Sequence, residues 1–325
     1  RAMAERRSRE PGLIDGLTAD LGGPRTGALL DRLSAAVDWE RLAAPVRELP
    51  EYTNDGPGRR PWPATMMLRC LMLAKWFNLS DPQLEESLRD RLSFRRFAGL
   101  CVDDATPDET SFVLFRRRLR EAGLHESLFA GVVEQLAEAG VLVREGAMVD
   151  ATIIEAPRGR GRGDGTSTRD PDASHTRKHG RGYFGYKGHI AADLGGVVVD
   201  WRLTPAREHE GHALDEMAAV NAWPAVWADA VHDSGPRRER LEAGGTRAWI
   251  AYQRRRGQGE LTEEQRRHNA AVARVRARVE HAFAMLKRQF GYRRARYRGL
   301  ERNALDFCLT LAAANIKRGA FLLGL

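Results

Sequence analysis

The sequence contains little cysteine and no long hydrophobic run. Its three cysteines, Cys70, Cys101 and Cys308, are far apart and form no C-x-x-C pair. They exclude a disulfide framework and suit a reducing cytosol. No stretch approaches the roughly 18 apolar residues of a membrane-spanning helix. The glycine-rich segment Gly159–Gly165 lacks the G-K-[S/T] ending and the strand–helix context of a phosphate-binding loop, so an ATP site is excluded as well.

Positive charge is what the chain has in excess. It carries 52 Lys and Arg against 44 Asp and Glu, a formal net charge of +8 at pH 7. Hydrophobic residues make up 42% of its 325 residues, which is typical of a globular protein with a buried core. A chain of this length is expected to form about two domains. This excess of positive charge does not specify a fold, but the commonest partner of such a basic protein is nucleic acid.

The first part of the chain has helical periodicity. Residues 1–25 are charged and glycine-containing and are predicted to be poorly ordered. Residues 26–140 are predicted to be all helical, and Ala64–Phe77, apolar almost all round, is expected to be a buried helix. Two capping boxes, each a Ser or Thr followed three residues later by Gln or Glu, begin further helices. These boxes are Ser80 with Gln83 and Thr106 with Glu109.

From residue 141 onward the pattern changes to alternating and β-branched segments. Strands are predicted at 147–154, 186–192, 197–203 and 225–231, and helices at 212–221, 270–289 and 303–321. Strands that give way to alternating helix and strand indicate an α/β layer rather than a sandwich. The sequence therefore predicts one α/β domain over residues 141–325, preceded by an all-helical domain. The segment 156–187 is predicted to be a long basic loop within the α/β domain.

Two aspartates interrupt apolar segments that are predicted to be strands. Asp150 lies inside the segment MVDATII, and Asp229 ends the segment AVWAD. A carboxylate in a core strand is costly unless it is paired or binds a metal ion. Each aspartate alone is explained equally well as a strand-end residue that caps the next turn, which is also the favoured interpretation of nearby Asp233. Together, Asp150 and Asp229 favour a shared divalent-cation site.

A predicted helix near the C-terminal end carries a third carboxylate between two cations. Arg276, Glu280 and Lys287 are four and seven residues apart, which puts them on one helical face beside an apolar stripe. An amphipathic helix with an exposed Arg–Glu pair, worth about 0.3–0.5 kcal/mol, explains the same spacing. The helix by itself therefore does not decide between a structural and a functional carboxylate.

Six segments, taken in order, resemble bacterial insertion-sequence transposases of the DDE type. They are LSDPQLEESLRDRLSFRRFAGL, VDATIIEAP around Asp150, FGYKGHIAAD, WADAVHDS around Asp229, ARVRARVEHAFAMLKRQFG around Glu280, and RGLERNALDFCLTLAAANIKR. Each segment is moderately specific, and their order together is highly specific. The match runs from about Pro63 to Lys317. Within the DDE type, the chain is similar to the insertion sequence 5 group and the insertion sequence 4-like group.

The resemblance implies an α/β fold with an RNase H-like mixed-sheet catalytic core after a helical domain for DNA binding and dimerisation. It assigns Asp150, Asp229 and Glu280 as catalytic residues and as ligands of two Mg²⁺ ions, with Mn²⁺ able to substitute. Two such ions ~4 Å apart activate the attacking oxygen and stabilise the leaving one. The implied activity is recognition of terminal inverted repeats, cleavage of double-stranded DNA at the element ends and joining of the 3′-OH ends to target DNA. A homodimer in the DNA complex, in the bacterial cytoplasm at the nucleoid, is implied as well.

The chain departs from the family pattern at two positions. The signature Y-x2-R-x3-E-x6-K maps onto Arg276, Glu280 and Lys287, but Ala273 stands where a Tyr is expected. After the second aspartate, His232 stands where a Tyr is usual. Neither departure changes one of the three assigned metal ligands.

Basic residues of two regions compete for the role of DNA contact. The loop 156–187 has eight Lys or Arg against three Asp, an excess of 8 − 3 = +5, and would clamp phosphates without reading sequence. The arginine-rich helical region would read inverted repeats like a helix-turn-helix, although a run of arginines is also common on a solvated surface. The residues assigned to DNA binding are Arg276, Lys287, Lys187, Arg177, Lys178, Arg116 and Arg117.

Two rival functions fit the same residues. One is a metal-dependent DNA nuclease that cuts without joining, and the other is a catalytically inactive, domesticated DNA-binding protein. The presence of all three carboxylates argues against the inactive protein. A strand-transfer assay with Mg²⁺ and the flanking repeats distinguishes the three functions.

Overall fold

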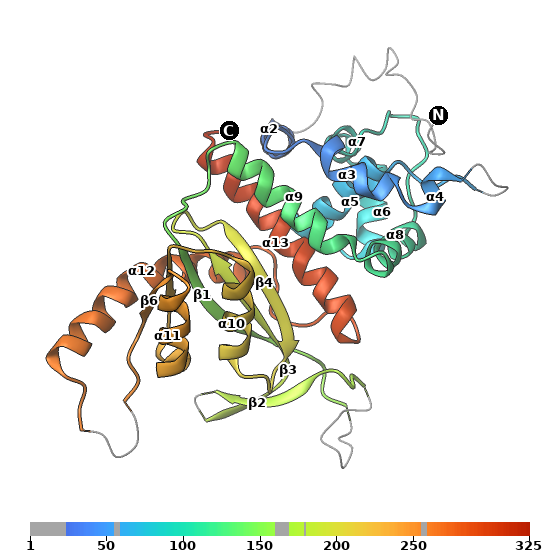
Figure 1. The fold of residues 1–325 in the computed structure, drawn as a ribbon. Helices are drawn as coiled ribbons and strands as arrows, with labels where there is room; N and C mark the ends of the chain where they lie inside the picture. Colours follow the sequence, from blue (N-terminus) through green and yellow to red (C-terminus); the bar gives the residue numbers. More distant parts are fainter. Residues whose placement is uncertain (1–23, 55–58, 160–168, 179, 255–258) are drawn as a thin grey trace. The chain divides into compact units, whose positions relative to one another are not determined.

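A computed structural model describes residues 24–54, 59–159, 169–178, 180–254 and 259–325 (Figure 1). The chain divides into two compact units: a helical unit, Arg1–Gly140 with Cys308–Leu325, and a sheet unit, Val141–Phe307. The segment 1–25, predicted to be poorly ordered, lies almost entirely outside the described residues. None of the helices in the described ranges combines the length and the apolar character that crossing a membrane requires.

The helical unit is built from amphipathic and apolar helices that share one buried core. Trp39, Trp76 and Phe97 meet edge to face, with ring centroids 5.5 to 6.4 Å apart. Residues 308–325, which the sequence pattern groups with the α/β domain, belong here because Leu309 and Ile316 pack with Trp39 around one apolar cavity. The helices are α2 (Pro24–Ala35), α3 (Trp39–Arg47), α4 (Pro50–Thr53), α5 (Ala64–Trp76), α6 (Asp81–Asp90), α7 (Leu92–Ala98), α8 (Glu109–Glu121), α9 (Leu124–Glu138) and the end of α13 (Leu300–Leu322).

One of the two predicted capping boxes is present and the other is wrong. Ser80 and Gln83 form the predicted box at the start of α6. The N-cap of α8 is Asp108 rather than Thr106, and its side chain accepts a hydrogen bond from Ser111 N at 2.7 Å. The reason is the intervening Pro107, which disfavours helical geometry in the residue before it and leaves Asp108 at the boundary.

The sheet unit contains a six-stranded mixed sheet. Its strands are β1 (Ala147–Glu155), β2 (Ser174–Lys178), β3 (Arg181–Ala192), β4 (Val198–Pro205), β5 (Ala225–Ala228) and β6 (Arg247–Ile250). The order is β2-β3-β1-β5-β6, with β4 also paired to β3. Pairs within β1 to β4 are antiparallel, whereas β5 runs parallel to both β1 and β6. The predicted fold class, an α/β protein with a helical N-terminal region and a mixed-sheet core, is confirmed.

Several predicted boundaries in the sheet unit are wrong. The basic loop 156–187 contains β2 and the first half of β3, whose ladder joins Ser174–Lys178 to Arg181–Gly185. The predicted strand 225–231 ends at Ala228 and continues into a short 3-10 helix, η1 (Ala230–His232). The strand β6 was not predicted, because four residues are too few to show a period.

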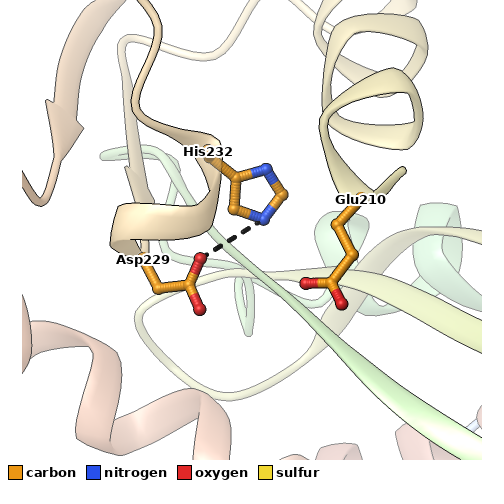
Figure 2. A group of neighbouring side chains, drawn as sticks. All are labelled: Glu210, Asp229 and His232. Carbon is orange, nitrogen blue, oxygen red and sulfur yellow. Dashed lines mark ion pairs between the residues drawn. The ribbon is translucent and has the colours of Figure 1, made fainter. Parts of the chain in front are cut away.

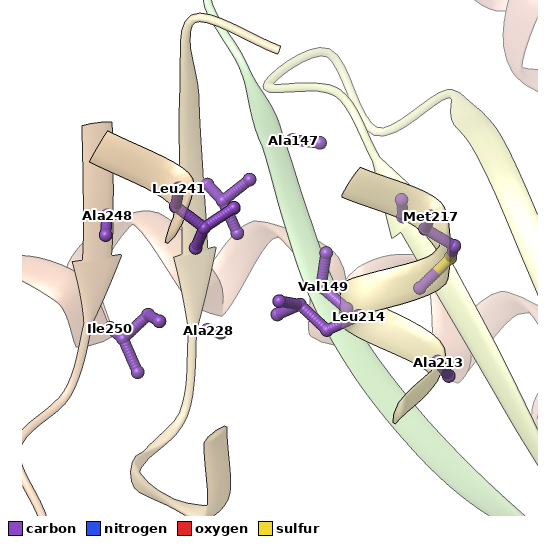
Figure 3. Packing of buried hydrophobic residues seen from close by; sticks show 11 residues of the cluster. Ala147, Val149, Ala213, Leu214, Met217, Ala228, Leu241, Ala248 and Ile250 are labelled. Carbon is purple, nitrogen blue, oxygen red and sulfur yellow. The ribbon is translucent and has the colours of Figure 1, made fainter. Parts of the chain in front are cut away.

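The two faces of the sheet carry different helices. Residues alternate between faces along a strand, and Val149 of β1 packs with Leu214 of α10 (Glu210–Val220) and, through one cluster, with Leu241 of α11 (Gly235–Ala243) (Figure 3). The next residue of β1, Asp150, contacts Arg276 of α12 (Glu263–Arg288). The sheet therefore lies between α10 and α11 on one face and α12 on the other.

Candidate metal centre at the strand ends

Asp150 and Asp229 lie at matching positions on neighbouring strands. The parallel register pairs Met148 of β1 with Trp227 of β5, and each aspartate follows two residues later. The structure thus brings together two of the three carboxylates that the sequence analysis assigns to the metal site. Their side chains are only 19% and 30% exposed, so the two charges share a poorly solvated corner of the sheet unit.

Arg276 of α12 lies between the two aspartates. Its Nη2 atom is 3.1 Å from Asp150 Oδ2 and 3.9 Å from Asp229 Oδ2. Burial raises the pKa of Asp150 above its usual value, and the Arg276 guanidinium opposes that shift. The buried Nε atom of Arg276 makes no hydrogen bond within the described residues. This arginine is the counter-ion of a carboxylate pair, and its own hydrogen bonds are incomplete.

Glu280 lies in α12, four residues and about one helical turn beyond Arg276, which corresponds to ~6 Å along the helix axis. The helix packs against β1, β5 and β6, so this turn runs beside the strand ends. The side chain of Glu280 lies outside the part of the chain that the structure describes. Its assignment as the third metal ligand remains a prediction.

Two cations predicted to bind DNA surround this corner. Lys287 is half-buried, and its pKa is lowered mainly by burial, then by the charges of Lys178 and Arg293, while Asp150 raises it. Lys178, at the end of β2, also lowers the pKa of Asp150. Lys178, Lys287 and Arg276 thus interact electrostatically with Asp150, and we call these three residues the basic rim.

The remaining predicted DNA contacts lie elsewhere. Arg177 is exposed on β2, and Lys187 is buried, donating from Nζ to Glu208 O at 2.8 Å. In the helical unit, Arg117 is exposed and pairs with Glu121 at 3.0 Å. Arg116 is buried there, and its two terminal nitrogens bond both carboxylate oxygens of Asp81. This buried ion pair favours a structural role for Arg116, and its assignment as a DNA contact stays a prediction.

Asp233 is the alternative to Asp229 as the second metal ligand, but its carboxylate oxygens accept other hydrogen bonds. Its Oδ1 atom accepts hydrogen bonds from Arg238 at 2.9 and 3.1 Å, and its Oδ2 atom accepts one from Gln253 N at 2.9 Å. The N-cap of α11 is Ser234, so Asp233 is not the cap that the sequence suggested. It fixes the segment after β6 to the start of α11.

Two polar residues beside Asp229 were not predicted to be functional. Glu210 at the start of α10 and His232 in η1 each place a potential ligand atom near Asp229, and the three atoms lie within 4.8 Å of one another (Figure 2). The substitution of the usual Tyr by His232 was visible in the sequence, but Glu210 had no signal of its own. Their proximity depends on how α10 and η1 meet, which spacing along the chain does not reveal.

Comparisons with known proteins show which families this chain resembles. The family model of the transposase DDE domain matches residues 142–316, just over half of the chain, and a second transposase domain model (DUF772) matches residues 23–118. A solved structure of a piggyBac transposase synaptic complex with hairpin DNA is 11% identical, with 98% of this chain and 77% of that chain covered. Its TM-score of 0.43 is too low to relate individual residues.

Proposed function

Because the chain belongs to the DDE transposases, we propose that Asp150, Asp229 and Glu280 form its catalytic centre and hold two Mg²⁺ ions, with Mn²⁺ as a substitute. The observation that carries this proposal is the pair of aspartates at matching positions of β1 and β5, which share one arginine as counter-ion. DDE transposases use divalent metal ions, and carboxylate oxygens are the ligands that Mg²⁺ and Mn²⁺ prefer.

The chain's own residues supply binding and positioning. When bound, the metal ions would activate the attacking oxygen and stabilise the leaving oxygen of a phosphodiester. Arg276 is the counter-ion that Asp150 and Asp229 share, so cations on these carboxylates would release its guanidinium. The released arginine and Lys287 would then hold phosphates of the cut strand beside the carboxylates.

The basic strand β2 extends this surface. Arg177 and Lys178 are exposed there and would contact phosphates without reading the base sequence. We assign recognition of the terminal inverted repeats and dimerisation to the helical region predicted over residues 26–140, where Arg117 is exposed. The proposed reaction is cleavage at the ends of an insertion sequence at the nucleoid, followed by joining of 3′-OH ends to target DNA.

The test is cleavage and strand transfer on DNA carrying the flanking repeats, with Mg²⁺. Asp150→Asn, Asp229→Asn and Glu280→Gln should each lower cleavage at least ~1000-fold, since losing metal stabilisation costs several kcal/mol. DNA binding should survive in all three variants. Glu208→Gln, which removes an exposed carboxylate near the same strand ends, is the matched control and should keep cleavage.

Three outcomes would change the assignment. Full activity of Asp229→Asn together with inactive, folded Asp233→Asn would move the second ligand to Asp233. Cleavage without joining in the unmodified protein would make it a nuclease. Binding without cleavage in the presence of either metal would make it an inactive DNA-binding protein.

A further inference from the structure

His232 is a buried histidine with unusual surroundings. Its side chain is 1% exposed, and neither ring nitrogen makes a hydrogen bond within the described residues. Burial is the main cause that lowers its pKa, and the charges of Asp229 and Glu210 oppose that shift. A buried ring nitrogen without a partner is costly and is rare in folded proteins. The imidazole therefore faces a position where a partner is expected.

Two carboxylates, those of Asp229 and Glu210, lie beside the ring of His232 at this position. The Nε2 atom of His232 is 3.7 Å from Asp229 Oδ1, and Glu210 brings a third ligand atom, all three within 4.8 Å of one another. Figure 2 shows the ring of His232 turned toward the space between Asp229 and Glu210. Two ligand atoms of a tetrahedral Zn²⁺ ion with bonds of ~2.1 Å are ~3.4 Å apart. A small inward movement would thus suffice to close the three atoms around an ion.

The two oxygens of Asp229 face different groups. Oδ1 is next to His232 and accepts a hydrogen bond from Val231 N at 3.1 Å, whereas Oδ2 is next to Arg276 at 3.9 Å. Glu210 begins α10, on the face of the sheet opposite α12. Asp229 therefore connects the catalytic corner with a second polar cluster on the α10 face.

The charges around this strand end leave room for a cation. Glu210 has a counter-ion in Lys187, whose Nζ atom is 3.5 Å from Oε1, and Arg276 serves Asp150 and Asp229 together. Lys178 and Lys287 of the basic rim act on Asp150, on the other face of the sheet. On the α10 face, Glu210 and Asp229 are mostly shielded from water, where a divalent ion binds two carboxylates favourably.

We propose that Glu210, Asp229 and His232 form a second cation site on the α10 face of the sheet. The site would prefer an ion that binds imidazole nitrogen, and Zn²⁺ is the ion that fits best. An imidazole with two carboxylates suits Zn²⁺, whereas Mg²⁺ prefers oxygen ligands alone. The inference rests on the proposed function only in that Asp229 is shared with the catalytic centre. An ion here would hold Asp229 by one oxygen and leave the other to the catalytic side.

Calorimetric titration of the metal-free full chain with Zn²⁺, in a competing chelator, tests the site. His232→Gln and Glu210→Gln should each weaken Zn²⁺ binding at least ~10-fold, since even partners that only orient a ligand are worth 10 to 100-fold. His212→Gln and Glu208→Gln are matched controls, because both side chains are exposed one turn or less from Glu210. They should leave Zn²⁺ affinity unchanged. Co²⁺ in place of Zn²⁺ gives a visible spectrum that should change in His232→Gln.

Each alternative outcome overturns the proposal. Equal losses in the controls would show adventitious surface binding, and unchanged affinity in both His232→Gln and Glu210→Gln would remove the site. If His232→Gln fails to fold, Glu210→Gln decides. Asp150→Asn should keep Zn²⁺ binding within ~3-fold, because Asp150 belongs to the catalytic side alone; a loss as large as that of His232→Gln would place the ion there. An Asp150→Asn variant that cleaves DNA would refute the proposed function and leave the Zn²⁺ site standing.

Discussion

Arg116 in the helical unit and Arg276 in the sheet unit are both shielded arginines next to aspartate, but their contacts differ. Arg116 is 11% exposed at its side chain and bonds both oxygens of Asp81 with two nitrogens. Arg276 is 20% exposed and reaches two aspartates with one nitrogen, while its buried Nε atom has no hydrogen bond within the described residues. The first pair is complete, whereas the second leaves both partners able to bind something else.

A second arginine of the helical unit shows the same completeness. Arg95 is buried and donates to three backbone carbonyls, those of Leu88, Cys101 and Asp104. Arg95 and Arg116 therefore fix helices and loops in place, and exposed cations such as Arg117 are the candidates for DNA contacts. In the sheet unit the position of a cation beside paired carboxylates points to chemistry instead. For Arg95, Arg116 and Arg276, the number of satisfied hydrogen bonds separates the two roles better than burial does.

The largest expected effect tests whether Arg116, unlike Arg276, has a structural role. Arg116→Met should lower the free energy of unfolding by about 3–5 kcal/mol, because Asp81 is left as a partly buried charge without its partner. Urea unfolding measures this loss. DNA cleavage per folded molecule should stay normal. Arg117→Met, an exposed pair one residue away, should cost less than about 1 kcal/mol. A stable Arg116→Met variant that no longer binds DNA would restore Arg116 as a DNA contact.

Arg276 should show the opposite pattern. Arg276→Met should lower single-turnover cleavage at least ~100-fold, because a scissile phosphate misplaced by ~1 Å costs about that much. Thermal unfolding in saturating Mg²⁺ should change little, since metal ions would compensate the Asp150 and Asp229 charges. Normal cleavage combined with a large drop in melting temperature would make Arg276 a structural arginine like Arg116.

His189 is a buried histidine of the sheet unit that should make the stability of this unit depend on pH. Burial, then the charges of Lys187 and His232, lowers its pKa from 6.5 to about 3. In this range the unfolded state binds the proton and the folded state does not, so stability is full above pH 6.5 and falls as the pH is lowered toward 3. The slope approaches ~1.4 kcal/mol per pH unit. His189→Gln should flatten this slope in acid unfolding curves, and the exposed His175→Gln should not. Equal slopes in all three proteins would show that His189 is protonated in the folded state.

The sequence predicted the parts of the sheet unit whose pattern is local. The strand around Asp150, β4 and the second half of β3 were predicted close to their observed positions, because apolar residues recur there over many positions. The strand β2 was read as a loop because its residues SHTRK are polar, and its pairing with β3 supplies the order that its own sequence lacks. Glu210 was missed for a related reason: it reaches Asp229 through the packing of α10, from a position 19 residues earlier in the chain.

The smallest expected effect concerns the salt dependence of DNA binding, which compares the basic residues of the sheet unit directly with those of the helical unit. Each neutralised phosphate contributes about −0.9 to the slope of log affinity against log salt. If the basic rim of the sheet unit contacts the DNA backbone, Lys178→Gln and Lys287→Gln should each reduce the magnitude of this slope by about 0.9, whatever the base sequence.

Arg117→Gln applies the same measurement to the helical unit. A loss confined to DNA that carries the inverted repeats would instead identify Arg117 as part of sequence recognition, because a phosphate contact weakens all sequences alike. Unchanged slopes in both lysine variants would remove the basic rim from the DNA path and leave the helical unit as the principal binding surface.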